Sequence, residues 1–398
     1  MIRLPREPKR TVWLLFLAQA LNQSAMTGQV AMAALIGHSL AADKSLATLP
    51  MAVQMLATMS VSIPGAVIFG RLGRHAGFLA GAAAFLVATG VFLAALWFGS
   101  FPLYLLGCVF SGAAFGIAMY YRFAAAEVAQ AEYRPKAISL VMAGGVIGAV
   151  LGPAIVKLTK DAFAPVLFAG TYLAFAAIPI MTALLVSAMR LPPAPHVAGA
   201  APVPLGPILR RPGVIVAILC AVVGWDSMNL LMAVTPLEMM LCGFTVGDSA
   251  TIIQWHAVAM FAPSFVTGHL IARFGVLRVI GAGALLTGIC AGVALSGSSF
   301  AHFWVALVLL GIGWNFMFVG ATALLTASHT PTERTKAQAA NDVIVFGSVA
   351  MTSLASGAIH HLFGWAVLNY AVLPALALAL VALAWLARRR AAGLPQPA

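Results

Sequence analysis

Four side chains with soft or borderline metal-binding atoms form two pairs at helical spacing. Met228 and Met232 are four residues apart, and so are His256 and Met260. Residues at i and i+4 lie on one face of a helix, so each pair would present its sulfur or imidazole atoms in one direction. Both pairs lie in very apolar segments, where a coordinating group is costly to bury unless a partner satisfies it.

Thioether sulfur and imidazole nitrogen together favour copper. Methionine sulfur is neutral and polarisable, and it suits Cu(I) far better than zinc, magnesium or iron. Neutral ligands also cost less to bury than carboxylates. The two pairs therefore predict a copper site on neighbouring helices. Two other interpretations stay open, because methionine commonly fills apolar cores and an intramembrane histidine often serves as a helix–helix hydrogen-bond partner or a proton relay.

The composition indicates a helical membrane protein. Of the 398 residues, 62% are hydrophobic and 8% are charged, and the mean hydropathy is +1.01, whereas about a quarter of a soluble chain is charged. The net charge of +12 does not indicate nucleic-acid binding, because the basic residues form no continuous face. No nucleophile elbow, P-loop or dinucleotide-binding turn is present, so we expect no enzyme activity and no permanent cofactor.

Apolar runs between charged or Pro- and Gly-containing breaks predict an all-α protein with twelve transmembrane helices. The first six are expected at 12–36, 46–69, 77–98, 101–129, 137–159 and 164–189. The second six are expected at 213–237, 247–272, 276–298, 301–328, 337–362 and 365–387. Because residues 190–212 contain seven prolines, they indicate a linker. We therefore predict six-helix bundles at 1–189 and 213–398, joined by a cytoplasmic linker at 190–212.

The placement of lysine and arginine predicts the orientation of the chain. Eighteen of the 22 fall on one side, in the N-terminus, the loops near 71–74, 134–136, 273–278 and 334–336, the linker and the C-terminal tail. Cytoplasmic loops are enriched in these residues. We therefore expect both termini and the linker on the cytoplasmic side of the membrane.

The two halves of the chain resemble each other. Arg71-Leu72-Gly73 matches Arg273-Phe274-Gly275 at an offset of 202, and Gln54 matches Gln254 at an offset of 200. The run from Gly70 to His75 resembles the signature between helices 2 and 3 of the major facilitator superfamily, and the glycines from Gly144 to Gly152-Pro153 resemble its helix 5 signature. That resemblance implies two parallel six-helix repeats that transport a solute by alternating access.

Within that superfamily, the two methionine and histidine pairs are similar to those of the CcoA-type copper importers. The resemblance implies import of copper for assembly of cbb3-type cytochrome c oxidase, with the two pairs as the essential residues. Copper is then the transported substrate, and a copper chaperone is the expected downstream partner. The family also has a cysteine pair flanking the seventh helix, which Cys220 and Cys242 match. Relatives without the motifs are thought to carry other cargo, including riboflavin.

Further sulfur atoms could assist such a site. Cys220 and Cys242 lie ~33 Å apart along one helix, too far for a disulfide, so we interpret them either as copper hand-off thiols or as small packing residues. Met26, Met55 and Met59 occupy corresponding positions in the first half of the chain. They could complete a coordination shell or simply pack against neighbouring helices.

Charged residues within or beside the spans are candidates for coupling and gating. Asp226 is an intramembrane carboxylate two residues before the first methionine of its helix, so it lies on a different face and could accept a proton or pair with a neighbouring helix. We expect Arg122 and Glu127, together with Arg71 and Arg74, near the cytoplasmic gate.

The sequence thus predicts a secondary transporter that imports copper. The alternative is a major facilitator carrier of a small organic solute, riboflavin-like or a drug. Trp225, Trp255 and Trp314 could line the cavity of such a carrier.

Overall fold

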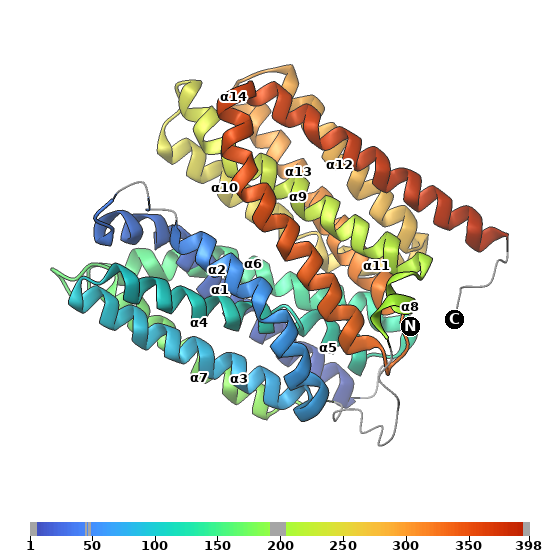
Figure 1. The fold of residues 1–398 in the computed structure, drawn as a ribbon, viewed down its shortest axis with the longest axis horizontal. Coiled ribbons are helices and arrows are strands. Elements are labelled where there is room, and N and C mark those ends of the chain that lie inside the picture. The colour runs from blue at the N-terminus through green and yellow to red at the C-terminus, as the bar shows by residue number, and fades with distance from the viewer. Residues whose placement is uncertain (1–5, 44–45, 47–48, 192–203, 393–398) are drawn as a thin grey trace. The chain divides into compact units, whose positions relative to one another are not determined.

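The predicted all-α architecture is confirmed. The computed structural model describes residues 6–43, 46, 49–191 and 204–392, and regular structure within these ranges is helical throughout (Figure 1). The chain divides into two compact units, the first comprising residues 1–130 and 141–198 and the second residues 131–140 and 199–398. The domain limits expected from the sequence stay a prediction, and most of the expected linker, residues 192–203, lies outside the described residues.

The first unit is built from α1 to α7, although α6 begins among residues of the second unit. Its helices are α1 (Arg6–Leu40), α2 (Leu49–Ser60), α3 (Ser62–Phe98), α4 (Phe101–Ala118), α5 (Tyr121–Val128), α6 (Arg134–Thr159) and α7 (Ala169–Ser187). A 3₁₀ turn, Ala131–Tyr133, precedes α6 and belongs to the second unit.

The second unit is built from α8 to α14. Its helices are α8 (Leu205–Leu209), α9 (Pro212–Leu241), α10 (Val246–Phe261), α11 (Ser264–Phe274), α12 (Val276–Ser296), α13 (Phe300–Thr326) and α14 (Arg334–Ala391). Helix α14 is two helices in one, because Gly364 has φ 79° and ψ 177° and breaks it into two segments.

Nine segments of the described residues are long and apolar enough to cross a membrane. These nine segments correspond to ten of the twelve predicted spans, because the segment Leu49–Phe98 contains two predicted spans. The remaining two predicted spans fall in α1 and in the first part of α14. Helix α1 is less apolar than the others because amide and hydroxyl side chains interrupt it, at Gln19, Asn22, Gln23, Ser24 and Gln29.

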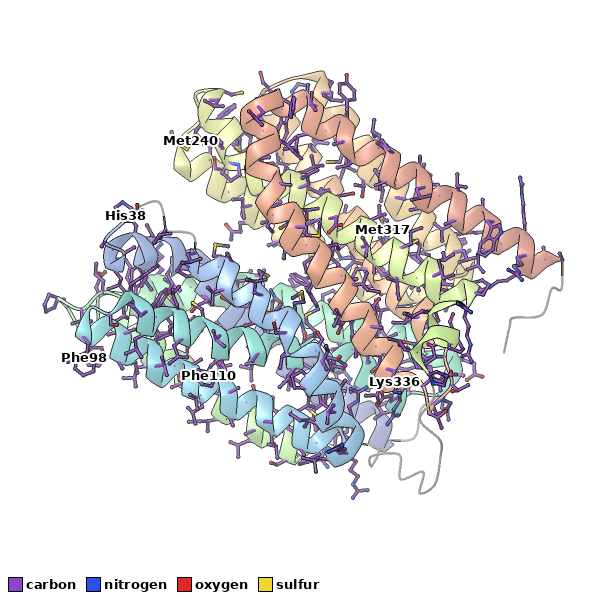
Figure 2. All side chains as sticks on the ribbon, viewed as in Figure 1. His38, Phe98, Phe110, Met240, Met317 and Lys336 are labelled. Carbon is purple, nitrogen blue, oxygen red and sulfur yellow. The ribbon has the colours of Figure 1, made fainter. Side chains whose placement is uncertain are left out.

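Large apolar side chains cover the outer faces of the helices (Figure 2). Phe98 at the end of α3 is 78% exposed and Met240 near the end of α9 is 56% exposed. Soluble proteins rarely expose such side chains over a continuous surface. A lipid environment removes this cost, so the exposed apolar faces agree with a membrane-embedded chain.

The internal repeat seen in the sequence is also a repeat of backbone conformation. Gly73 has φ 84° and ψ 172°, and Gly275, 202 residues later, has φ 88° and ψ 150°. Positive φ is readily adopted by glycine alone. Each glycine ends one membrane crossing and begins the next, so the matched Arg-x-Gly tripeptides make the same turn in both units.

A second repeated contact corrects the alignment of the two halves. A Cβ atom added at Gly112 would lie 2.8 Å from the Cβ of Ala57 and would also collide with the carbonyl oxygen of Gln54. A Cβ atom added at Gly311 would meet Ala259 at 2.9 Å and the carbonyl oxygen of His256 at 2.8 Å. Because Gly112 and Gly311 make matching contacts, Gln54 occupies the position equivalent to His256, at an offset of 202, and not the position equivalent to Gln254.

Candidate functional site

The four predicted copper ligands all lie in the second unit. Met228 and Met232 are on α9, and His256 and Met260 are on α10. Met228, His256 and Met260 are buried, and Met232 is half-buried.

The hydrogen bond of His256 fixes which ring nitrogen carries the proton. Its Nδ1 lies 2.8 Å from the carbonyl oxygen of Leu307. A carbonyl oxygen only accepts, so Nδ1–H must donate. In a neutral imidazole, Nε2 then has a bare lone pair, and this atom is buried with no hydrogen-bond partner in the described part of the chain. A backbone carbonyl holding one ring nitrogen is also how metal-ligating histidines are commonly oriented.

The structure does not by itself assemble a metal site around His256. Its Nε2 has no hydrogen bond to a methionine sulfur among the described residues. Among the described residues, no group of three or more histidine, cysteine, aspartate or glutamate side chains is placed to hold a metal ion. The assignment of the four residues as copper ligands stays a prediction.

The other predicted sulfur atoms are distributed over both units. Cys220 is buried and Cys242 is exposed, and both are free thiols. In the first unit, the sulfur of Met26 accepts a hydrogen bond of 3.0 Å from Gln54 Nε2. Met55 and Met59 on α2 are half-buried. The 202-residue offset equates the Met26 and Gln54 pair with Met228 and His256.

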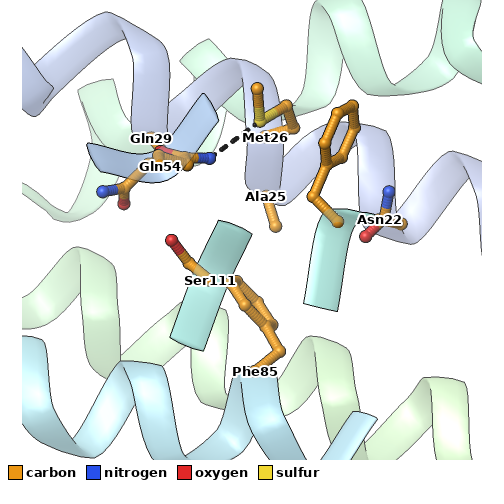
Figure 3. A pocket seen from close by; sticks show the side chains of 8 residues that line it. Asn22, Ala25, Met26, Gln29, Gln54, Phe85 and Ser111 are labelled. Carbon is orange, nitrogen blue, oxygen red and sulfur yellow. Dashed lines mark hydrogen bonds between the residues drawn. The ribbon is translucent and has the colours of Figure 1, made fainter. Parts of the chain in front are cut away.

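A cavity inside the first unit gathers the polar side chains of α1, α2 and α4. We call it the amide pocket, and Figure 3 shows most of its side chains. Its volume is about 10 Å³, and it is lined by Asn22, Ala25, Met26, Gln29, Gln54, Phe85, Ser111 and Phe115. A second cavity of about 20 Å³ shares Asn22 and Phe85 with it. The pocket was not expected from the sequence, although Asn22, Met26 and Gln29 have the i, i+4, i+7 spacing of one helix face.

Two tyrosines hold Gln29 in place. The hydroxyl of Tyr172 donates to Gln29 Oε1 at 3.0 Å, and Gln29 Nε2 donates to the hydroxyl of Tyr104 at 3.4 Å. The two hydroxyls are themselves 3.0 Å apart. All three side chains are buried. This closed ring of hydrogen bonds satisfies buried polar groups and orients one wall of the amide pocket.

The intramembrane carboxylate of Asp226 lies on a polar seam between α9 and α14. Thr352 Oγ1 donates to Asp226 Oδ1 at 3.5 Å, and Asn229 Nδ2 donates to Ser353 Oγ at 2.8 Å. Asp226 is half-buried. Its role in coupling stays a prediction, and in the described part of the chain the geometry shows a hydroxyl group rather than a cation in contact with it.

Two of the residues expected near the cytoplasmic gate, Arg74 and Glu127, form an ion pair. Arg74 Nη2 lies 2.5 Å from Glu127 Oε1, and both side chains are buried. The guanidinium of Arg122 lies 4.4 Å from the ring centre of Phe123, and Arg71 is exposed. Their gating role stays a prediction.

Two further contacts of carboxylate groups in the second unit were not expected from the sequence. Arg211 contacts Glu333 through two bonds of 2.6 and 2.8 Å. His360 Nε2 donates to Glu238 Oε2 at 2.8 Å. The partners in each pair are more than 100 residues apart in sequence, so no local spacing reveals them.

Comparisons with known proteins identify the family. The profile described as Major Facilitator Superfamily matches residues 15–262 and 242–398. The riboflavin transporter RfnT of Brucella anthropi is 39% identical over 381 residues, which cover 94% of this chain and 95% of that protein. The uncharacterized MFS-type transporter YdeG of Bacillus subtilis is 31% identical, covering 88% of this chain and 85% of that protein.

A solved structure shows the same fold. A variant of the E. coli fucose:proton symporter FucP superposes with a TM-score of 0.79 at 16% identity, covering 96% of this chain and 99% of that chain. Together with the helical architecture and the two repeated units, the matches place this chain in the Major Facilitator Superfamily, as a membrane-embedded secondary transporter and not an enzyme.

Proposed function

We propose that this protein carries riboflavin or a closely related flavin across a bacterial inner membrane by alternating access. The observation that carries the proposal is the 39% identity to the riboflavin transporter RfnT along almost the whole of both chains. This favours the organic-solute alternative over copper import.

Aromatic side chains of the second unit suit a planar heterocyclic cargo. In the second unit, Trp225 and Trp314 lie edge to face with ring centres 5.1 Å apart, and Phe318 stacks on Trp314 at 5.0 Å. The indole nitrogens of both tryptophans are buried without an acceptor in the described residues. Because a buried indole N–H usually has a hydrogen-bond partner, these two donors would suit a ligand with acceptor atoms.

Uptake of labelled riboflavin tests the proposal. Cells that lack riboflavin synthesis and their own carrier should grow at limiting riboflavin only when they express this protein. Trp225→Phe, which keeps an aromatic ring but removes the N–H donor, should lower uptake by about fivefold, the value of one hydrogen bond. Trp97→Phe on the exposed face of α3 is the matched control and should leave uptake unchanged. Wild-type protein that is abundant in the membrane yet gives no riboflavin uptake would refute the proposal.

Copper import is retained as a second candidate because of one observation. His256 presents a buried Nε2 lone pair with no partner among the described residues, and Met228 and Met260 are buried in the same unit. On this candidate, Cu(I) is the transported substrate and a downstream chaperone carries it to cbb3-type oxidase assembly.

One substitution separates the two candidates. His256→Gln replaces the imidazole with the side chain found at the equivalent position, Gln54. If copper is the cargo, radioactive copper uptake should fall to the level of cells without the protein, because an amide is a poor ligand for Cu(I). If riboflavin is the cargo, cells that express the wild-type protein and cells without the protein should take up copper equally.

A further inference from the structure

Asn22 supplies the amide pocket with a hydrogen-bond donor that the protein does not use. Its Nδ2 atom is buried and has no acceptor in the described part of the chain. A buried donor without an acceptor lowers the stability of the fold. Asn22 lines both cavities of the first unit, so an acceptor that enters either one can satisfy it.

Gln54 supplies a second donor, which is bound to a weak acceptor. Its Nε2 donates to the thioether sulfur of Met26 at 3.0 Å (Figure 3). Thioether sulfur accepts hydrogen bonds much more weakly than a carbonyl oxygen does. A carbonyl group entering the pocket would therefore be the preferred partner of this amide.

Ser111 supplies an acceptor to the same cavity. Its only hydroxyl hydrogen is donated to the carbonyl oxygen of Cys108 at 3.2 Å, so its oxygen has lone pairs to offer. Figure 3 shows this hydroxyl on the side of the cavity that faces the two glutamines. The pocket thus offers the amide donors of Asn22 and Gln54 together with the hydroxyl acceptor of Ser111.

We propose that the amide pocket binds the imide edge of the transported heterocycle, in which an N–H group lies between two carbonyl groups. The inference rests on the proposed function and adds to it the recognising residues, Asn22, Gln54 and Ser111. The imide offers two acceptors and one donor, which is the complement of this set. A volume of about 10 Å³ holds a group of the size of one water, so the cavity admits one carbonyl group of this edge while the rings stay outside.

Competition by sulfur analogues tests the inference. Riboflavin uptake is measured against unlabelled riboflavin, 2-thioriboflavin and 4-thioriboflavin, each of which replaces one carbonyl oxygen with a weaker acceptor. With wild-type protein, at least one thio analogue should compete about fivefold less well than riboflavin, because it loses one good hydrogen bond.

Substitutions at Asn22 connect that difference to the pocket. Asn22→Leu should weaken the binding of riboflavin about fivefold. The variant should then bind riboflavin and the affected thio analogue equally well. Asn22→Asp has the same shape but replaces the donor with an acceptor, so it should be at least as harmful. Asn369→Leu makes the same exchange at another buried amide, and the gap between riboflavin and the thio analogue should persist.

The outcomes separate the inference from the proposed function. Riboflavin uptake with equal competition by both thio analogues overturns the inference and leaves the function standing, with the pocket holding only a structural water. The inference also fails if the Asn22→Leu variant still shows the difference in competition between riboflavin and the thio analogue. A wild-type protein that takes up no riboflavin overturns both. The analogue comparison on wild-type protein needs no variant to fold.

Discussion

At the scale of single residues, Glu333 illustrates how buried charge is stabilised outside the membrane-spanning segments. Burial alone would raise the pKa of its carboxyl group. The backbone N–H of Thr330 and the guanidinium of Arg211 both donate to it, and these bonds outweigh burial. They lower the pKa of Glu333 from its ordinary value of 4.5 to about 2.

This shift predicts a pH dependence of stability. A carboxyl group with a lowered pKa in the folded state stabilises the fold above its unfolded-state pKa and loses that contribution as pH falls through the folded-state value. The unfolding midpoint of purified protein should therefore exceed that of Glu333→Gln at about pH 6, and the difference should shrink from pH 4.5 towards pH 2. A difference that is constant across this range would contradict the assignment.

The ion pair of Arg74 and Glu127 predicts an asymmetric mutational effect. Removing one partner leaves the other charge buried, which costs about 3–5 kcal/mol, whereas replacing both with apolar side chains is often neutral. Arg74→Met should therefore lower the unfolding midpoint in detergent strongly, and Arg74→Met combined with Glu127→Leu should recover much of the loss. A double variant less stable than the single one would show that the cation–π contacts of Arg74 with Phe69 and Tyr120 matter more.

At the residue scale, the sequence reports which side chains lie together only where one helix carries the pattern. The spacing of Met228 and Met232 is local, so the sequence reveals that they share a face. The amide pocket draws Asn22, Gln54 and Ser111 from three helices, and no spacing in the sequence reports their proximity. Only the polar interruption of an otherwise apolar α1 indicated that this helix has a special environment.

At the scale of helices, the span limits were predictable because apolar length sets them. The breaks that interrupt a helix within a span were not predictable from the sequence. Helix α10 ends at Phe261 and α11 begins at Ser264, with Pro263 between them, and proline cannot donate the helix hydrogen bond expected of it. The sequence shows the proline, but the surrounding packing decides whether a helix bends or breaks there.

Helix packing predicts which glycines are replaceable. A Cβ atom at Gly112 would collide with α2, whereas a Cβ atom at Gly90 on α3 has no neighbour within 4 Å. Gly112→Ala should therefore reduce membrane abundance and the unfolding midpoint, at a cost of about 1–3 kcal/mol for an overpacked interface. Gly90→Ala should be neutral or slightly stabilising, since alanine favours helix by about 1 kcal/mol over glycine. Equal effects of both substitutions would contradict close packing of α2 on α4.

At the scale of the whole molecule, the two halves of the chain repeat the same structural features, which explains why a few matched sequence positions were enough to infer the fold. The Gly73 and Gly275 turns repeat one conformation, and the Gly112 and Gly311 contacts repeat one packing arrangement. The repeated architecture does not determine the transported substrate, because the two repeats carry different polar side chains at equivalent positions. Gln54 faces a sulfur atom, whereas His256 presents a nitrogen with no partner among the described residues.

The distribution of basic residues predicts the orientation of the whole chain. The loop around Asp43 contains one lysine, whereas the tail contains Arg388, Arg389 and Arg390, and positively charged segments stay in the cytoplasm. Alkaline phosphatase, which is active only outside the cytoplasm, should therefore be active when fused after Asp43 and inactive when fused after residue 392. Green fluorescent protein fused after residue 392 should fluoresce. The reverse pattern would place the tail outside, and the proposed direction of riboflavin uptake would then require the opposite sequence of conformational steps.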